Sequence, residues 1–233
     1  MANSLIAEIF SDFVSLFFPS YCIACSDSLA KGENLVCTKC MLEIPQTNYH
    51  RDVENPLYTR LSNRFKLGRA TALFKFSKTS RIQHLLHALK YKNQPDVGIM
   101  LGNVLGQRLS DVSDWNQSDL IIPVPLHPSR KRKRGYNQSA KFAEGLSRKL
   151  GIPFSDDVLI KKISTETQTK KNKLNRWQNV DEVFHVKNPL AVKNKRILLV
   201  DDVITTGATI EACAQALLRY GCCEVNVASI AEA

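Results

Sequence analysis

The sequence predicts an α/β protein, with a mostly parallel sheet covered by helices on both faces and a small cysteine-rich module before it. Short apolar runs typical of buried strands alternate with segments of helical periodicity. Polar loops directly follow two of these strands, at the edge where such folds bind ligands. Two Cys-x-x-Cys pairs lie close together near the N-terminus. We expect residues 1–45 to form a helix and the module, 46–68 a connector and 69–233 the α/β domain.

The composition predicts an ordinary globular chain. Its 233 residues are 44% hydrophobic and 23% charged, which suits one domain of moderate size with a small appendage. The net charge of +10 favours polyanionic partners, although we interpret the scattered lysines as solvated surface. No stretch has the pattern of a membrane span, so we expect a cytoplasmic protein.

Residues 1–18 are predicted to form an amphipathic helix that ends before Pro19. The stretch is apolar at near-helical spacing but is interrupted by Glu8 and Asp12. It has neither a basic start nor a clear cleavage site, so we do not expect a signal peptide. Two interpretations of its apolar face remain, packing against the core, which is favoured, and attachment to a membrane surface.

Four cysteines, Cys22, Cys25, Cys37 and Cys40, have the spacing of a metal site. Two such pairs joined by a short turn place four thiolates around one zinc ion. The module has few apolar residues, so metal binding would supply its folding free energy. Two disulfides or a redox pair are the competing interpretations, and a cytoplasmic location disfavours disulfides. We predict a structural zinc site with no open position for catalysis.

The remaining elements follow from the hydrophobic periodicity. The connector is polar and Asn-rich, with a few apolar anchors. Two helices are expected between residues 79 and 109, broken near Asn93-Gln94-Pro95. Other helices are expected at 136–150 and 208–220, and strands at 69–77, 119–126, 157–160, 196–202 and 225–231.

The segment 197–217 carries the strongest functional signal. The apolar run Ile197–Val200 predicts a buried strand, and Asp201 and Asp202 follow at its carboxyl end. The loop Thr205–Thr209 then opens a helix, whose N–H groups and hydroxyls suit a phosphate. The carboxylates would accept hydrogen bonds from sugar hydroxyls or face a cation, and Gly207 permits close approach of the backbone. An ordinary turn with capping threonines is the alternative.

Two basic segments accompany this loop. Five consecutive basic residues, Arg130 to Arg134, follow the strand that ends in Pro123-Val124-Pro125, and arginines there can hold a diphosphate. A solvated run of charge is the alternative. The second segment, 161–184, is either a flap that closes over a polyanion or a plain surface hairpin.

These motifs resemble a known family. The Asp-Asp-x-x-Thr-Thr-Gly-x-Thr loop closely resembles the loop of type I phosphoribosyltransferases that binds 5-phosphoribosyl-1-pyrophosphate (PRPP). Residues 123–143 resemble the Arg-x-x-x-Arg-Gly-aromatic-Asn-Gln signature of the ComF family, and 17–25 and 85–94 resemble two further ComF segments. The resemblance spans nearly the whole chain. The chain departs from the family pattern in its unusually basic Lys131–Lys133 and in the segment 181–184.

The resemblance implies a type I phosphoribosyltransferase fold that binds PRPP with magnesium. Asp201 and Asp202 would meet the ribose and be the catalytic pair, Asp202 also stabilising positive charge at the sugar. The expected PRPP-binding residues are Val203, Ile204, Thr205, Thr206, Gly207, Ala208 and Thr209, with Pro123, Val124, Pro125, Leu126, Arg130 and Arg134 at the diphosphate. The family's flap-like segment matches at Thr165, Gln168, Arg176, Asn179 and Phe184.

The resemblance leaves turnover of PRPP open. Some members of the superfamily transfer the ribosyl group to a nucleophile, whereas others bind PRPP as regulators. An intact loop is stronger evidence for binding than for chemistry, and the sequence shows no obvious pocket for a base. The chain also lacks the N-terminal catalytic cysteine of the glutamine-dependent amidotransferases, so we do not expect glutamine hydrolysis.

The ComF resemblance also implies a role in natural competence, the uptake of single-stranded DNA. The expected DNA-binding residues are Arg130, Lys131, Arg132, Lys133, Arg134 and Tyr136, with Tyr136 or Trp177 available for base stacking. Three hypotheses follow, namely a PRPP-binding protein that handles single-stranded DNA, a phosphoribosyltransferase of nucleotide salvage, and a PRPP-sensing regulator or adaptor. Proteins of the competence machinery are possible partners, and relatives in the superfamily often form homodimers.

Overall fold

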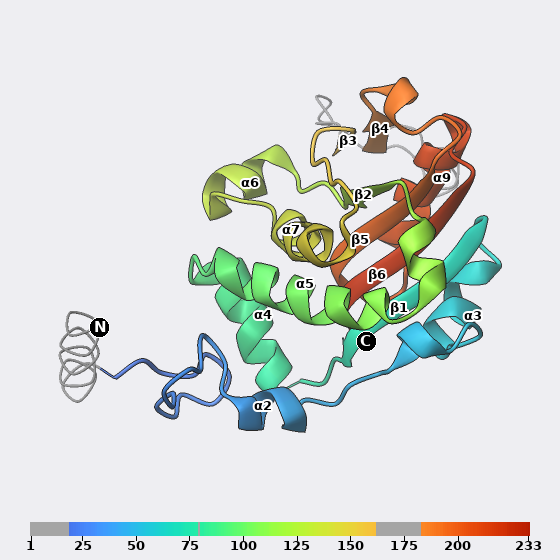
Figure 1. Ribbon diagram of the computed structural model, residues 1–233. Helices are drawn as coiled ribbons and strands as arrows, with labels where there is room; N and C mark the ends of the chain where they lie inside the picture. The colour runs from blue at the N-terminus through green and yellow to red at the C-terminus, as the bar shows by residue number, and fades with distance from the viewer. Residues whose placement is uncertain (1–18, 79, 162–182) are drawn as a thin grey trace, which may run out of the picture.

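The computed structural model describes residues 19–78, 80–161 and 183–233. Figure 1 shows a central sheet with helices on both faces. In this described part, the sheet has parallel strands in the order β1-β6-β5-β2. Their bounds are β1 Leu67–Lys75, β2 Leu120–Pro123, β5 Arg196–Ile204 and β6 Glu224–Glu232. The predicted α/β fold with a mostly parallel sheet is confirmed, whereas the helix predicted at 1–18 lies outside the described residues.

Both faces of the sheet are buried, which explains its unbroken apolar strands. In β5, Ile197 and Leu199 belong to one buried cluster, and Leu198 and Val200 belong to the other. Successive side chains of a strand point to opposite faces, so each face needs its own apolar set. Two helical layers supply the partners of these side chains.

The first layer consists of α4 (Arg81–Tyr91), α5 (Pro95–Ser110) and α7 (Gln138–Leu150). The break predicted near Asn93–Pro95 is confirmed, and α5 begins at Pro95. Helices α5 and α7 cross so closely that a Cβ atom on Gly145 would lie 2.2 Å from the carbonyl oxygen of Ile99. Glycine is therefore required at this crossing.

The second layer contains α9 (Ala208–Arg219) and α3 (Pro56–Ser62). Helix α3 lies inside the predicted connector, where no helix was expected. The side chain of Asn55 caps it by accepting hydrogen bonds from the N–H groups of Leu57 and Tyr58. Leu57 and Leu61 are fully buried. Seven residues with two buried leucines give a weak periodic signal, so only the Asn-Pro start pointed to this helix.

Two further segments differ from the sequence-based expectation. The basic run forms a helix of its own, α6 (Pro128–Arg134), which ends at Gly135 in the left-handed conformation. The strand predicted at 157–160 is β3 (Leu159–Lys161), and it pairs antiparallel with β4 (Phe184–Val186) apart from the main sheet. The flap residues between these strands, Thr165, Gln168, Arg176 and Asn179, lie outside the described residues, as does Trp177.

The cysteine-rich segment packs against the first helical layer. It contains α2 (Thr38–Glu43), and its Cys22 and Cys40 share a buried cluster with Leu85 of α4. Short 3-10 helices complete the described elements, η1 at Tyr49–Arg51, η2 at Ser113–Gln117 and η4 at Pro189–Ala191. Among the described residues, we find no helix with the length and hydropathy needed to cross a membrane.

Candidate functional site

The paired carboxylates lie at the carboxyl end of β5, one position beyond the end of β2. Pro123, the last residue of β2, is in register with Val200, so Asp201 and Asp202 extend past the neighbouring strand. The hydroxyl of Ser139 donates to Asp201 Oδ1 at 2.9 Å, and the N–H of Asp202 donates to the same oxygen at 2.8 Å. Lys90 Nζ lies 3.0 Å from Asp202 Oδ2. The two acids therefore have different partners.

Their surroundings make Asp201 an unusual acid. Burial first, and then the negative charge of Asp202, raise its pKa to about 7. The N–H of Asp202, the Ser139 hydroxyl and the Lys90 ammonium act against this rise. Asp201 can therefore hold or release a proton near neutral pH.

Both carboxylates line a cavity of about 320 Å³. Its other walls come from the C-terminal end of α4, the loop after β2, one side of α6 and the first turn of α7. Lys161 of β3 and Phe184 of β4, the described member of the predicted flap-like segment, also line it. Lys90, Arg130, Arg134 and Lys161 place four cations around the two acids. Thr209, in the first turn of α9, also lines it, so the carboxylates and the start of the helix face the same space. Such a cavity suits a ligand that has both hydroxyl groups and phosphates.

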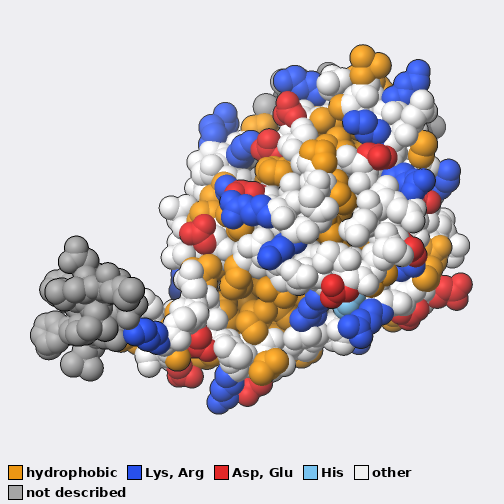
Figure 2. All heavy atoms as spheres, in the orientation of Figure 1, with side chains coloured by type: hydrophobic (Ala, Val, Ile, Leu, Met, Phe, Trp, Pro, Cys, Tyr) orange, Lys and Arg blue, Asp and Glu red, His pale blue; other side chains and the backbone are white. Residues whose placement is uncertain are grey.

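The basic helix α6 distributes its charges over different sides. Arg130 and Arg134, four residues apart, line the carboxylate cavity, whereas Lys131 Nζ lies 3.4 Å from Asp156 Oδ2. Arg132 and Lys133 line a second hollow of about 650 Å³, together with Lys90, Arg130 and Arg134, and none of the lining residues that the structure describes is acidic. We call it the basic hollow. Figure 2 shows Lys and Arg side chains on the surface formed by α6.

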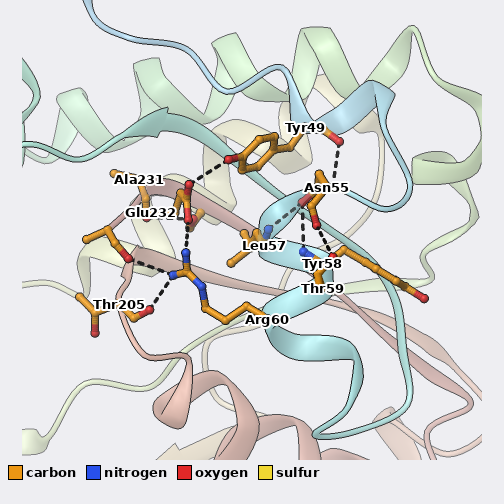
Figure 3. A network of polar contacts seen from close by, with 11 residues as sticks. Tyr49, Asn55, Leu57, Tyr58, Thr59, Arg60, Thr205, Ala231 and Glu232 are labelled. Atoms are coloured by element: carbon orange, nitrogen blue, oxygen red, sulfur yellow. Dashed lines mark hydrogen bonds and ion pairs between the residues drawn. The ribbon is translucent and has the colours of Figure 1, made fainter.

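The threonine loop is held in place by helix α3. Arg60 Nη1 donates to the carbonyl oxygens of Thr205 at 2.8 Å and Ala233 at 2.9 Å, and its Nη2 donates to Glu232 Oε2 at 2.7 Å (Figure 3). The hydroxyl of Tyr49 donates to the other oxygen of Glu232 at 3.0 Å. The predicted connector thus supports the predicted phosphate loop.

Gly207 joins this loop to α9. Its φ of +81° is in the left-handed region, and a Cβ atom there would lie 2.5 Å from Leu61 Cδ2. The N–H of Ala208 donates to Thr206 Oγ1 at 3.4 Å. The side chain of Ile204 is buried in the core, so only its backbone faces the loop region. Val203 and Thr205, both predicted to bind PRPP, line a different hollow, which also includes Asp202.

The sequence analysis assigned no role to several residues of this cavity. Lys90 and Tyr91 come from the Leu-Lys-Tyr segment of α4, and Gln138 and Ser139 come from the first turn of α7. Gln138 accepts from Arg134 Nη1 at 2.8 Å, while its own buried Nε2 has no partner within the described part of the chain. Two features of the sequence could have identified these four residues as site residues. They lie in segments that resemble a family, and they are charged or polar residues within helices.

The two tyrosines near α6 differ in exposure. Tyr136, predicted to stack on bases, is partly buried against the core, and its hydroxyl donates to the Leu89 carbonyl oxygen at 2.5 Å. Tyr91 is 64% exposed, and the Arg134 guanidinium lies 5.2 Å from its ring centre. Tyr91 is therefore the more accessible ring.

The four predicted metal ligands are brought together. The sulfur atoms of Cys22, Cys25, Cys37 and Cys40 all lie within 4.8 Å of one another. The N–H of Cys37 points at Cys22 Sγ from 3.3 Å, and the N–H of Cys40 at Cys37 Sγ from 3.4 Å. Burial by itself would raise the pKa of Cys22, but the N–H groups directed at its sulfur together lower it to about 7. These donors favour the thiolate, which is the form that binds metals.

Comparison with known proteins adds independent evidence. Residues 136–233 match the family model described as "Phosphoribosyl transferase domain". The chain is 30% identical to Competence protein F of Haemophilus influenzae over 230 residues, which cover 93% of this chain and 99% of the relative. It is 32% identical to the DNA utilization protein YhgH of Escherichia coli O157:H7 over 149 residues, which cover 61% of this chain and 63% of that protein.

A solved structure also resembles the chain. It is the glutamine PRPP amidotransferase from B. subtilis complexed with ADP and GMP, with 25% identity and a TM-score of 0.45. The match covers 62% of this chain and 30% of that chain.

Proposed function

This chain belongs to the ComF family of competence proteins, and on that premise we propose that it binds PRPP with magnesium and handles single-stranded DNA during natural transformation. One observation carries the PRPP proposal. Two carboxylates, four cations and the start of α9 line a single cavity of about 320 Å³. A phosphorylated ribose with a diphosphate needs these three kinds of partner together.

Each group has a distinct task in this proposal. Asp201 and Asp202 accept hydrogen bonds from the ribose hydroxyls, and Arg130 and Arg134 donate to the diphosphate. The N–H groups and hydroxyls from Thr206 to Thr209 hold the 5-phosphate at the positive end of α9, whereas Thr205 lines the neighbouring hollow. Lys90, now 3.0 Å from Asp202, can turn toward the diphosphate when the ligand enters. Magnesium would neutralise part of the diphosphate charge.

We also propose that the four cysteines hold a structural zinc ion. Four sulfur atoms at zinc-bonding distance from one ion lie about 3.8 Å apart. The sulfur atoms of Cys25 and Cys37 are 3.9 Å apart, which fits this geometry. Because the protein supplies all four ligands, the ion would stabilise the fold and not catalyse a reaction.

The basic hollow supports the DNA-binding part of the proposal. None of its described lining residues is acidic, although Lys90, one of its five cations, is paired with Asp202 next to the hollow. The exposed ring of Tyr91 also lines it. The backbone phosphates of a single strand could bind to these cations, and one of its bases could stack on the ring. Lys90, Arg130 and Arg134 line this hollow and the carboxylate cavity alike, so we expect DNA and PRPP to compete.

A calorimetric titration of the full chain with PRPP and magnesium tests this function. We expect saturable binding that Asp202→Asn weakens by about tenfold, the effect of losing one charge-assisted hydrogen bond. A gel shift should detect a single-stranded oligonucleotide bound at low salt, and added PRPP should weaken that binding. Unchanged PRPP affinity in Asp202→Asn would remove this carboxylate from the site.

A second candidate function is phosphoribosyl transfer to a small nucleophile. The raised pKa of Asp201 favours it, because a carboxyl that titrates near pH 7 can exchange a proton with a reacting group. Release of diphosphate from PRPP in the presence of purines, pyrimidines or amines would establish transfer. Binding without release would leave the DNA-handling function.

A further inference from the structure

A second hollow adjoins the carboxylate cavity and has a different chemistry. It measures about 410 Å³ and lies between α4 and the carboxyl ends of β1 and β5. Both linings include Lys90, Tyr91 and Asp202, so the Lys90–Asp202 ion pair borders both spaces. We call this second space the side hollow.

The lining of the side hollow suits a flat, largely neutral ring. Phe76, Leu86 and Val203 give it apolar walls, while Gln83, His87 and Thr205 give it polar groups. Among the described lining residues, the only acid and the only lysine, Asp202 and Lys90, are paired with each other at 3.0 Å, in contrast to the four cations of the carboxylate cavity. A phosphate would find no free cationic partner among these residues. An aromatic heterocycle needs apolar contact on its faces and hydrogen bonds at its edge.

The walls of the side hollow are held in position by the fold. The N–H of Phe76 donates to the carbonyl oxygen of Glu232 at 2.7 Å, which fixes the end of β1 beside β6. Leu86 is almost fully buried, and the rings of His87 and Tyr91 lie 5.0 Å apart on consecutive turns of α4. The hollow is thus bounded by regular elements and not by a loop.

We propose that the side hollow binds a nucleobase. The inference rests on the proposed function, because a ribose held by Asp202 would have the cationic cavity on one side and the side hollow on the other. The diphosphate suits the first space and a base suits the second. The base can come from a free purine or pyrimidine or from a nucleotide of a single strand, and both sources present the same ring.

The fluorescent base 2-aminopurine tests the proposal in the full chain. It is titrated as the free base and as one residue in a single-stranded oligonucleotide, each with and without PRPP and magnesium. We expect at least one form to bind with quenched fluorescence, because the ring stacks beside aromatic side chains. If the free base binds, the natural ligand of the side hollow is a free purine or pyrimidine. If only the oligonucleotide binds, the natural ligand is a nucleotide of a single strand.

A matched pair of substitutions makes the test specific. Gln83→Trp fills the side hollow from an exposed position on α4 and should weaken base binding by about tenfold or more, the scale of a lost stacking contact. Gln107→Trp makes the same change at an exposed position on α5, away from the hollow, and should leave base binding within about twofold. Thermal melting checks that both variants fold, and His87→Trp is a second way to fill the space.

The outcomes separate this inference from the proposed function. PRPP binding with no binding of either form of the base, or equal base affinities in Gln83→Trp and the parent, would overturn the side hollow as a base site. Base binding that Gln83→Trp abolishes, without any PRPP binding, would keep the base site and remove the proposed function.

Discussion

Asp201 shows how one side chain can couple function to stability. Its carboxyl is partly buried, and its pKa is raised to about 7. Between pH of about 4 and about 7, the folded protein therefore keeps a proton that the unfolded chain releases. The stability linked to this proton is fully present below pH of about 4 and is lost as the pH rises through about 7. A buried acid near a second acid thus makes the fold less stable at neutral pH, as expected where function opposes stability.

Asp201→Asn should therefore stabilise the protein at pH 8, because the amide cannot ionise. We expect its melting temperature at pH 8 to exceed that of the parent by about 3–10 °C, and the difference to shrink at pH 5. Thermal unfolding followed by circular dichroism measures both. Ser139→Ala keeps the carboxyl but removes a donor to it, so it should melt lower than the parent at pH 8. An Asn variant that melts below the parent at pH 8 would contradict this account.

Arg60 is the second residue with an effect beyond its own position. Its guanidinium bonds to the Thr205 carbonyl oxygen and so holds the phosphate loop against α3. Arg60→Met should weaken PRPP binding by about tenfold, because the loop loses a charge-assisted hydrogen bond, and Arg60→Lys should recover part of the affinity. Calorimetry measures the effect. Arg51→Met, at an exposed position on η1, is the control and should bind PRPP like the parent. Equal affinity in Arg60→Met would limit Arg60 to a structural role.

At the scale of elements, α6 explains how one basic run can serve two ligands. Five consecutive basic residues in a sequence do not show which way each side chain points. Once the run is helical, residues four apart share a side, and the charges separate into groups that face different spaces. Arg130 and Arg134 line both the carboxylate cavity and the basic hollow, whereas Arg132 and Lys133 line the basic hollow and not the cavity. Lys131 is paired with Asp156.

This separation predicts distinct effects on PRPP and DNA. Arg130→Gln with Arg134→Gln should weaken PRPP binding by about tenfold or more, whereas Lys131→Gln should leave it within about twofold. Arg132→Gln with Lys133→Gln should keep PRPP affinity and lower the salt dependence of oligonucleotide binding by about 1.4 in log–log slope. Calorimetry and fluorescence anisotropy measure the two affinities. Equal losses of PRPP affinity in all three variants would mean that the run acts only through its total charge.

At the scale of the whole molecule, the cysteine-rich segment and the α/β domain share one core. Cys40 and Ile44 pack in the same buried cluster as Leu85. His84 Nδ1 lies 2.8 Å from the Ala24 carbonyl oxygen, and Arg81 forms an ion pair with Glu43. Loss of the proposed zinc ion should therefore disturb α4, which carries Lys90 and Tyr91 of the candidate ligand site.

We expect removal of zinc by a chelator to lower the melting temperature of the entire chain by about 10 °C, in one transition, because a few kcal/mol of docking free energy is lost. Cys40→Ser should have the same effect, and Cys223→Ser, at an exposed cysteine, should have none. Differential scanning calorimetry measures the transitions. Two separate transitions, with the main one unchanged, would show that the segment folds independently.

The sequence alone predicted the α/β class, the break before α5, the strand with its two acids and the grouping of four cysteines. These features depend on local patterns, namely apolar periodicity, proline positions and short-range spacing, which act within a few residues. The resemblance to a family also pointed to the segments that form α4 and α7. It did not show which of their side chains would lie in the site.

Only the tertiary structure decided which residues meet. It brought Lys90 and Ser139 to the two acids, placed α3 beneath the phosphate loop, moved β3 out of the main sheet and opened a hollow beside Asp202 where the sequence showed no pocket. These contacts join residues far apart in the chain, and their free energy comes from packing and paired charges in the folded state. A pattern read along one segment does not contain that information.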